Sequence, residues 1–212
     1  MPKFKLGFLT LNMSFTEFDS TLRQTESLEL NEEEKPFLPR CQLEVLKRAA
    51  MGDSNRKIAR ELGSRPSTVK NHFSQQKKYG YSGIFERLNV QSRTEAVIEA
   101  IRWGIIDLEE IQINIIKPEG VPEEKLPLIQ LELKILILTA RGYTNFQVGR
   151  ELNRRPQTVK NHFSQRFKAG DNPGIFEKLG VPSRTAAVVR ALQLGIITLE
   201  EIYEGKKAYL PG

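Results

Sequence analysis

Apolar residues recur along two stretches of this chain at steps of three and four, which is the spacing of one face of an α-helix. Leu43, Leu46, Ala49 and Ala50 form one such row, and residues 133–140 hold a similar one. In each stretch the pattern predicts four helices. The first helix ends at a glycine, and the short second helix has a Ser or Thr N-cap. The third helix has a proline in its first turn, and the last helix begins at a serine. The marker residues are Gly52, Ser54, Pro66 and Ser92 in the first stretch, and Gly142, Thr144, Pro156 and Ser183 in the second. The expected fold class is all-α, with a helix–turn–helix at the centre of each stretch.

The two stretches are copies of one unit. Residues 43–82 align with residues 133–172 without a gap, and 20 of these 40 pairs are identical. After one inserted residue, Pro173, residues 83–111 align with residues 174–202, where 19 of 29 pairs are identical. Each copy therefore has the size of a small autonomous domain rather than that of a solenoid repeat.

The segment between the two copies is predicted to be a linker. Residues 112–126 contain Pro118, Gly120 and Pro122, a composition that is typical of linkers. We expect a first helix–turn–helix domain at 35–111, a short linker at 112–126, a second helix–turn–helix domain at 127–204 and a C-terminal tail at 205–212. Residues 1–34 belong to neither copy and are assigned to no domain.

The amino-acid counts exclude several classes of protein. One Cys and two His among 212 residues exclude an internal disulfide and argue against a thiolate- or His-based metal site, so no metal or other cofactor is expected. No stretch approaches the roughly 20 apolar residues of a membrane helix, and the first residues lack the pattern of a targeting signal. The expected localisation is cytoplasmic, without a membrane partner.

Positive charge is concentrated within the two copies. The chain has a formal net charge of +6, yet residues 60–80 hold five basic and one acidic residue, and residues 150–170 hold six and one. Both windows contain the same eight residues, Thr-Val-Lys-Asn-His-Phe-Ser-Gln, at 68–75 and at 158–165. Local positive surface of this kind favours a nucleic-acid partner.

Helical geometry divides this shared block into two faces. Val69, His72 and Phe73 lie at i, i+3 and i+4, so we expect them to face the core. The remaining residues are short polar side chains and one lysine, the types that contact phosphates and base edges in a major groove. Simple solvent exposure is the alternative for these polar residues, and a structural role is the alternative for the two histidines.

Further motifs flank the shared block in both copies. In the first they are Ala50, Gly52, Ser54-Asn55, Ile58-Ala59, Thr68-Val69-Lys70 with His72, Arg93-Thr94 and Gly104-Ile105-Ile106. In the second they are Gly142, Thr144-Asn145, Thr158-Val159-Lys160 with His162, Lys178-Leu179-Gly180-Val181, Arg184-Thr185 and Gly195-Ile196-Ile197. As an ordered set, each copy resembles the LuxR/GerE-type DNA-binding domain of bacterial transcription regulators. The resemblance covers about two-thirds of the chain.

The resemblance implies that the third helix of each copy enters the major groove of double-stranded DNA. It also implies a two-fold contact between the last helices, here as an intramolecular pseudo-dimer, and leaves further oligomerisation open. The residues expected at DNA are Asn55, Arg65, Ser67, Thr68, Lys70, Asn71, His72, Gln75, Lys77, Lys78, Asn145, Arg155, Gln157, Thr158, Lys160, Asn161, His162, Gln165, Arg166 and Lys168. The residues expected at a contact between domains or chains are Arg93, Ala96, Val97, Ala100, Arg184, Ala187, Val188 and Ala191.

Each copy departs from the spacing of that family after its third helix. The next motif leucine lies 16 residues after His72 and 17 residues after His162, where the family usually has about eight. We expect the third helix to end near Gly80 and Gly170, and the extra residues to form a basic loop.

The leading hypothesis is a sequence-specific DNA-binding transcription regulator. The alternative is a protein-interaction module, built from helix–turn–helix units, that binds RNA polymerase or another regulator. The charge concentrated on the shared block favours DNA. A nucleic-acid enzyme would need a carboxylate cluster or an activated nucleophile, and the sequence has no acidic set with metal-ligand spacing, so no catalytic residue is expected.

Overall fold

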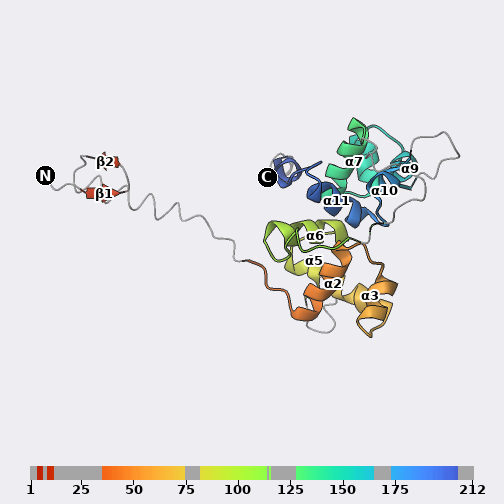
Figure 1. The fold of residues 1–212 in the computed structure, drawn as a ribbon, viewed down its shortest axis with the longest axis horizontal. Helices are drawn as coiled ribbons and strands as arrows, with labels where there is room; N and C mark the ends of the chain where they lie inside the picture. The colour runs from red at the N-terminus through yellow and green to blue at the C-terminus, as the bar shows by residue number, and fades with distance from the viewer. Residues whose placement is uncertain are drawn as a thin grey trace. The chain divides into compact units, whose positions relative to one another are not determined.

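The computed structural model describes residues 4–6, 9–11, 35–74, 82–113, 115, 128–164 and 173–204. The chain divides into two compact units, Met1–Lys35 and Pro36–Gly212. In the first unit β1 (Phe4–Leu6) and β2 (Leu9–Leu11) pair antiparallel, with Phe4 opposite Leu11 and Leu6 opposite Leu9 (Figure 1). The sequence assigned no element to this segment, so the small hairpin is an addition to the expected architecture.

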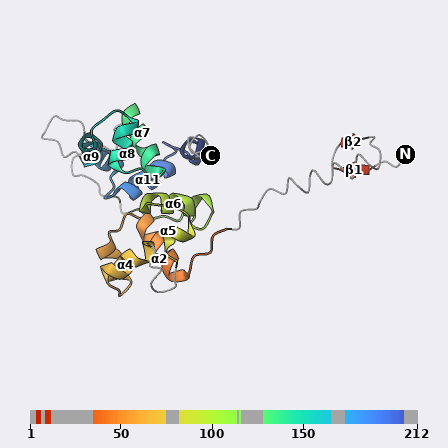
Figure 2. The ribbon, with the colours of Figure 1, turned by 180° about the vertical axis from the view of Figure 1, so that it is seen from behind.

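The second unit holds both copies of the repeat, and its described residues form helices (Figures 1 and 2). The first copy contains α2 (Arg40–Ala50), α3 (Asn55–Glu61), α4 (Pro66–Phe73), α5 (Ile84–Arg87) and α6 (Arg93–Arg102). The second contains α7 (Gln130–Ala140), α8 (Asn145–Glu151), α9 (Pro156–Ser164), α10 (Ile175–Leu179), α11 (Arg184–Gln193) and α12 (Leu199–Glu204). The expected all-α architecture is confirmed, with α3–α4 and α8–α9 as the two helix–turn–helix pairs. The short helices α5, α10 and α12 were not predicted.

Local signals set the ends of the helices as expected. Gly52 and Gly142 follow the first helix of each copy at φ of +92° and +91°, a left-handed conformation that glycine adopts without strain. Ser54 and Thr144 cap the second helix, since each side-chain oxygen accepts a hydrogen bond at 3.3 Å from the backbone N–H three residues on. The last helix has a serine N-cap in each copy.

In the first copy the third helix ends earlier than the sequence predicted. α4 ends at Phe73, well before Gly80, whereas α9 is described through Ser164 and its predicted end near Gly170 lies outside the described residues. In the first copy Ser74 follows the helix with an extended ψ of 138°, and its hydroxyl donates a hydrogen bond of 3.0 Å to the carbonyl four residues before it. Ser164 makes the equivalent bond of 3.1 Å while it is still part of α9, so the extended backbone of Ser74, rather than this bond, marks the end of α4.

The apolar face of the third helix holds it against the core in each copy. Val69 and Phe73 on α4 are at most 5% exposed, and Val159 and Phe163 on α9 are 1% exposed. Each phenylalanine ring also lies 5.5 or 5.3 Å, centre to centre, from a ring on the short helix that follows. The expected inner face is confirmed for these four residues. Within the described part of the chain, no helix is long and apolar enough to cross a lipid bilayer.

Candidate nucleic-acid interface

α4 and α9 each turn a polar face outward. The side chains of this face are Ser67, Thr68, Lys70 and Asn71 on α4, and Gln157, Thr158, Lys160 and Asn161 on α9. All are exposed except Thr158, which is half-buried. An exposed arginine, Arg65 or Arg155, directly precedes each helix. Each face therefore combines two cations with short hydrogen-bonding side chains, a set suited to phosphate oxygens and base edges.

The two motif histidines lie at the edge of this face rather than in the core. His72 and His162 are both half-buried. Burial lowers the pKa of His72 below its usual value of 6.5, because desolvation penalises the charged imidazolium. His72 is therefore neutral at pH 7 and brings hydrogen-bonding capacity, not charge, to the helix.

Arg93 at the start of α6 braces the helix–turn–helix of the first copy. Its Nη1 donates to Asn55 Oδ1 at 2.7 Å, and its Nη2 donates to the backbone carbonyl of Asp53 at 2.5 Å. The guanidinium also lies 5.1 Å from the centre of the Phe73 ring. Burial lowers the pKa of Arg93 to about 10, although the Asp53 carboxylate acts in the opposite direction. One side chain thus ties the end of α4 to the start of α3.

The second copy repeats this brace. Arg184 Nη2 donates to Asn145 Oδ1, and its guanidinium lies 4.8 Å from the centre of the Phe163 ring. Burial lowers the pKa of Arg184 as well. The sequence placed both arginines at a contact between domains or chains; these bonds run inside each domain, and Arg93 also lines a cleft formed by both copies. Asn55 and Asn145, expected at DNA, are half-buried and offer amide oxygens that a cation at the start of the last helix can reach.

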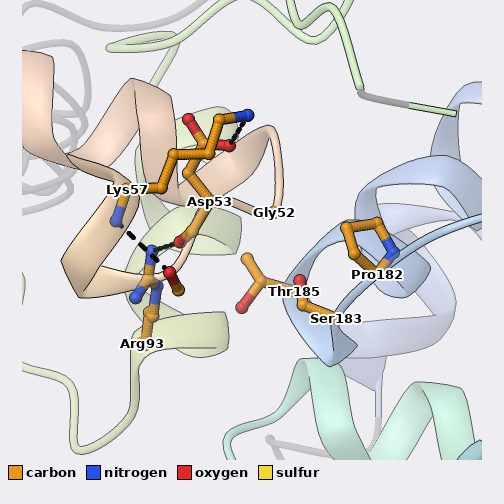
Figure 3. A pocket seen from close by; sticks show the side chains of 8 residues that line it. Gly52, Asp53, Lys57, Arg93, Pro182, Ser183 and Thr185 are labelled. Carbon is orange, nitrogen blue, oxygen red and sulfur yellow. Dashed lines mark hydrogen bonds and ion pairs between the residues drawn. The ribbon is translucent and has the colours of Figure 1, made fainter. Parts of the chain in front are cut away.

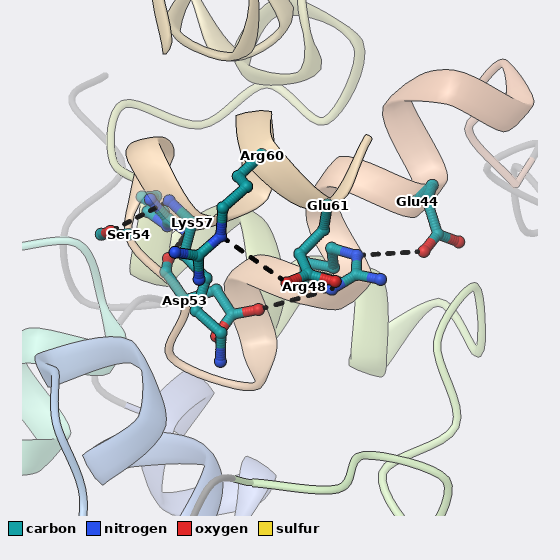
Figure 4. Close-up of polar contacts among 8 residues, drawn as sticks. Glu44, Arg48, Asp53, Ser54, Lys57, Arg60 and Glu61 are labelled. Atoms are coloured by element: carbon teal, nitrogen blue, oxygen red, sulfur yellow. Dashed lines mark hydrogen bonds and ion pairs between the residues drawn. The ribbon is translucent and has the colours of Figure 1, made fainter. Parts of the chain in front are cut away.

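A cluster of charges surrounds the first copy's second helix and was missed by the sequence analysis (Figure 4). The Asp53 carboxylate, whose side chain is 3% exposed, lies 2.6 Å from Lys57 Nζ and 3.7 Å from Arg48 Nη1. Arg48 also pairs with Glu44 and with Glu61, at 3.4 and 3.7 Å. The cluster belongs to the first copy alone, because Tyr143 stands in the second at the place of Asp53. Part of the positive charge of α3 is therefore already engaged within the domain.

The two copies meet along α6 and α11. These helices pack on each other, while α11 also packs on α2 and α6 on α7. Thr94 Oγ1 and Thr185 Oγ1, which are equivalent residues of the two copies, share a buried hydrogen bond of 3.1 Å. The apolar residues that the sequence placed at a contact are all fully buried in these helices: Ala96, Val97, Ala100, Ala187, Val188 and Ala191. We call this contact the seam.

Two glycines of the seam allow close approach. A Cβ added to Gly52 would lie 2.8 Å from Ala186 Cβ, and one added to Gly142 would meet the Glu95 side chain closer than atoms can pack. These two contacts are again equivalent, because Gly142 corresponds to Gly52 and Glu95 to Ala186 in the alignment of the copies. Beside Gly52 a cleft of about 450 Å³ opens (Figure 3). Its lining comes from both copies: Gly52, Asp53, Ser54, Lys57 and Arg93, with Pro182, Ser183 and Thr185.

Longer side chains also link the two copies near the C-terminal ends of α6 and α11. The Arg102 guanidinium lies 4.7 Å from the centre of the Tyr203 ring, so α6 of the first copy contacts α12 of the second. Burial and the hydrogen-bonded Glu99 carboxylate raise the pKa of Tyr203, which stays neutral. Gln193 Nε2 donates to the carbonyls of Leu108 and Ile111, at 3.0 and 2.9 Å. Polar contacts across the copies therefore add to the buried apolar surface.

Some of the residues expected at DNA lie outside the described residues. They are Gln75, Lys77 and Lys78 after α4, and Gln165, Arg166 and Lys168 after α9.

Comparison with known proteins identifies the family. The sequence profile described as "Bacterial regulatory proteins, luxR family" matches residues 37–100 and again residues 127–191. The chain belongs to the luxR family. The two matches contain α3–α4 and α8–α9, so both helix–turn–helix pairs lie within the regions that match the luxR family.

Several luxR-family relatives are similar to this chain. It is 38% identical over 86 residues to the uncharacterized transcriptional regulatory protein YxjL of Bacillus subtilis, a match that covers 41% of this chain and 35% of that protein. It is 40% identical over 72 residues to the probable transcriptional regulatory protein NarL of Mycobacterium tuberculosis, covering 34% of this chain and 30% of that protein. The chain thus spans about a third of the length of these two relatives. The spore germination protein GerE of B. subtilis is matched over 89% of its length and 35% of this chain, at 31% identity over 74 residues. No solved structure matches the chain significantly.

Proposed function

We propose that this chain binds double-stranded DNA in a sequence-specific manner, with α4 and α9 in the major groove, and regulates transcription in the bacterial cytoplasm. The observation that carries the proposal is the outward face of the two helices. Seven of the eight residues from Pro66 to Phe73 recur unchanged from Pro156 to Phe163, and the polar ones point away from the core. Solvent exposure alone places no constraint on which polar residue stands at a position, so this agreement favours a shared ligand.

We further propose that both helices bind one duplex, as an intramolecular pseudo-dimer. Support comes from the seam, where equivalent residues meet each other: Thr94 meets Thr185, and the Gly52–Ala186 contact repeats as Gly142–Glu95. In a two-fold contact residue i meets j and j meets i, and these pairs follow that rule. A two-fold relation presents α4 and α9 in opposite directions, and the expected target is therefore an inverted repeat with half-sites about one turn apart.

The cations of the two faces supply the affinity that does not depend on sequence. All four cations are exposed: Arg65 and Arg155 directly precede α4 and α9, and Lys70 and Lys160 are the fifth residues of these helices. Each phosphate that such a side chain neutralises releases counterions, so binding weakens as salt rises. Asn55 contributes through its amide N–H groups, since its oxygen is held by Arg93.

Fluorescence anisotropy with a labelled duplex tests this assignment. The double variant Lys70→Ala/Lys160→Ala should bind all sequences more weakly and should reduce the slope of log affinity against log salt by about 2. The matched control is Arg40→Ala/Lys134→Ala, which removes two exposed cations from α2 and α7 and should leave the slope unchanged. If the first variant keeps the affinity and slope of the wild type, α4 and α9 are not the docking face.

One observation favours the alternative, a module that binds a polymerase subunit or another regulator. Phe146 on α8 is 66% exposed, and the equivalent residue of the first copy is Arg56. An exposed aromatic side chain is a common anchor in protein interfaces. A partner that binds independently of salt, together with no shift of DNA, would support this function over the first.

A further inference from the structure

We infer that the two halves of the DNA target differ at one mirrored position, and that Gln157 sets this difference. The inference rests on the proposed function and deepens it. Between Pro66–Phe73 and Pro156–Phe163 the only substitution is Ser67 against Gln157. Both residues are exposed, one residue after the proline that opens the helix.

Gln157 changes the chemistry of the helix face beyond its own position. Its Nε2 donates a hydrogen bond of 2.8 Å to Asn161 Oδ1, one helical turn further along α9. Two side chains at i and i+4 lie side by side on a helix, so this bond joins the two amides into one polar unit. Asn161 is itself exposed and was expected at DNA.

The joined amides present one acceptor and one donor. Gln157 Oε1 accepts, and the Asn161 Nδ2 group donates. Adenine offers the complementary pair in the major groove, because N6 donates and N7 accepts. No other base presents this adjacent donor and acceptor at its major-groove edge. The unit on α9 therefore selects adenine in the second half-site.

The first copy cannot form this unit. Ser67 carries a hydroxyl one bond from Cβ and has no amide, so α4 cannot pair two side-chain amides at this position. A serine hydroxyl donates or accepts with equal ease and contacts any base. The first half-site is therefore more permissive at the position that mirrors the adenine.

The two helices are seated alike, so the difference is one of chemistry rather than of position. Val69 and Val159 are 0% and 1% exposed, and each phenylalanine at the end of the face packs on a ring at 5.5 or 5.3 Å. Arg93 and Arg184 brace the two helix–turn–helix pairs through bonds to the same amide oxygen, Oδ1 of Asn55 and of Asn145. A common seating brings residues 67 and 157 to mirrored base pairs.

Selection of bound sequences from random DNA provides the test. The wild-type chain should select an imperfect inverted repeat with adenine fixed in one half and several bases accepted at the mirrored position. The Ser67→Gln variant should select adenine at the mirrored position of both half-sites. The Gln157→Ser variant should accept several bases at this position in both half-sites. In binding assays on single duplexes, changing the selected adenine should lower affinity roughly 5-fold to 150-fold for the wild type, and much less for Gln157→Ser. Replacing that adenine with 7-deazaadenine, which lacks the N7 acceptor, should weaken the wild type in the second half-site and not in the first.

Orientation gives an independent readout, because the only cysteine, Cys41 on α2, is exposed and can carry a dye. Energy transfer from Cys41 to an acceptor on one end of the selected duplex should report one preferred orientation. The double exchange Ser67→Gln/Gln157→Ser should reverse it. A selected site with two identical halves, unchanged in both single variants, overturns this inference while leaving the proposed function standing. Failure of the wild type to bind any sequence preferentially overturns the proposed function itself.

Discussion

Replacing Thr94 with valine should destabilise the chain more than replacing Thr94 and Thr185 together. The two hydroxyls share a 3.1 Å hydrogen bond, and the residues are only 8% and 5% exposed. A single Thr→Val change keeps the shape of the side chain but leaves the other hydroxyl buried without this partner, at a cost of about 1–3 kcal/mol. Replacing both removes the pair, which is nearly neutral when the shape is preserved. We expect each single variant to lose about 1–2 kcal/mol and the double variant to lie within about 1 kcal/mol of the wild type.

Urea unfolding of the four proteins measures this coupling. The single tryptophan, Trp103, follows the last residue of α6 and reports directly on one side of the seam. Thr139→Val is the matched control, because the Thr139 hydroxyl is equally buried but donates at 2.7 Å to a carbonyl of its own helix. The loss of unfolding free energy caused by Thr139→Val should add to that caused by Thr94→Val, since the two hydroxyls share no partner. A coupling energy near zero between Thr94→Val and Thr185→Val would contradict this prediction, because the hydroxyls would then not depend on each other.

Three further variants test other contacts. Glu132→Gln should destabilise the second copy by about 3 kcal/mol in urea unfolding, because it removes the carboxylate that lies 2.8 Å from Lys178 Nζ, where both side chains are at most 3% exposed. Gly142→Ala should cost at least about 1 kcal/mol, since its φ is +91° and the new Cβ would collide with Glu95; a thermal melt as sharp and as high as that of the wild type would contradict this. Acidification should lower stability as the pH falls from about 6.5 toward the depressed pKa of His72, because the unfolded chain then binds a proton that the folded chain does not. His72→Gln should remove that part of the pH dependence of unfolding, and an unchanged pH profile would exclude His72 as its source.

The features that the sequence predicted correctly are those with local causes. Gly52 and Gly142 end their helices because a left-handed residue is needed there, and Ser54 and Thr144 cap because an oxygen stands three residues before an unpaired N–H. The outward face of α4 follows in the same way from the spacing of its apolar residues. Such signals involve residues only a few positions apart, so they can be read without a structure.

One feature that the sequence did not predict depends on residues far apart in the chain, and two others depend on the local conformation of neighbouring residues. Arg93 reaches Asn55 across 38 positions, and nothing near either residue marks the bond. α4 ends where the backbone of Ser74 becomes extended, a change that apolar spacing does not indicate. The amide pair on α9 was within reach of the sequence, since Gln157 and Asn161 are four apart, but their orientation toward each other had to be observed.

The seam also bears on how this protein changes over generations. In a homodimer one mutation alters both halves of an interface at once, so an unfavourable contact is made twice and a favourable asymmetry cannot arise. Here each half is encoded separately. The equivalent glycines Gly52 and Gly142 contact different residues, Ala186 and Glu95. At another pair of equivalent positions, Asp53 forms ion pairs in the first copy and the second copy has Tyr143. When two copies of a domain lie in one chain, one copy can therefore accumulate substitutions while the other keeps its original contacts. A new DNA-sequence specificity can then be acquired in one half at a time.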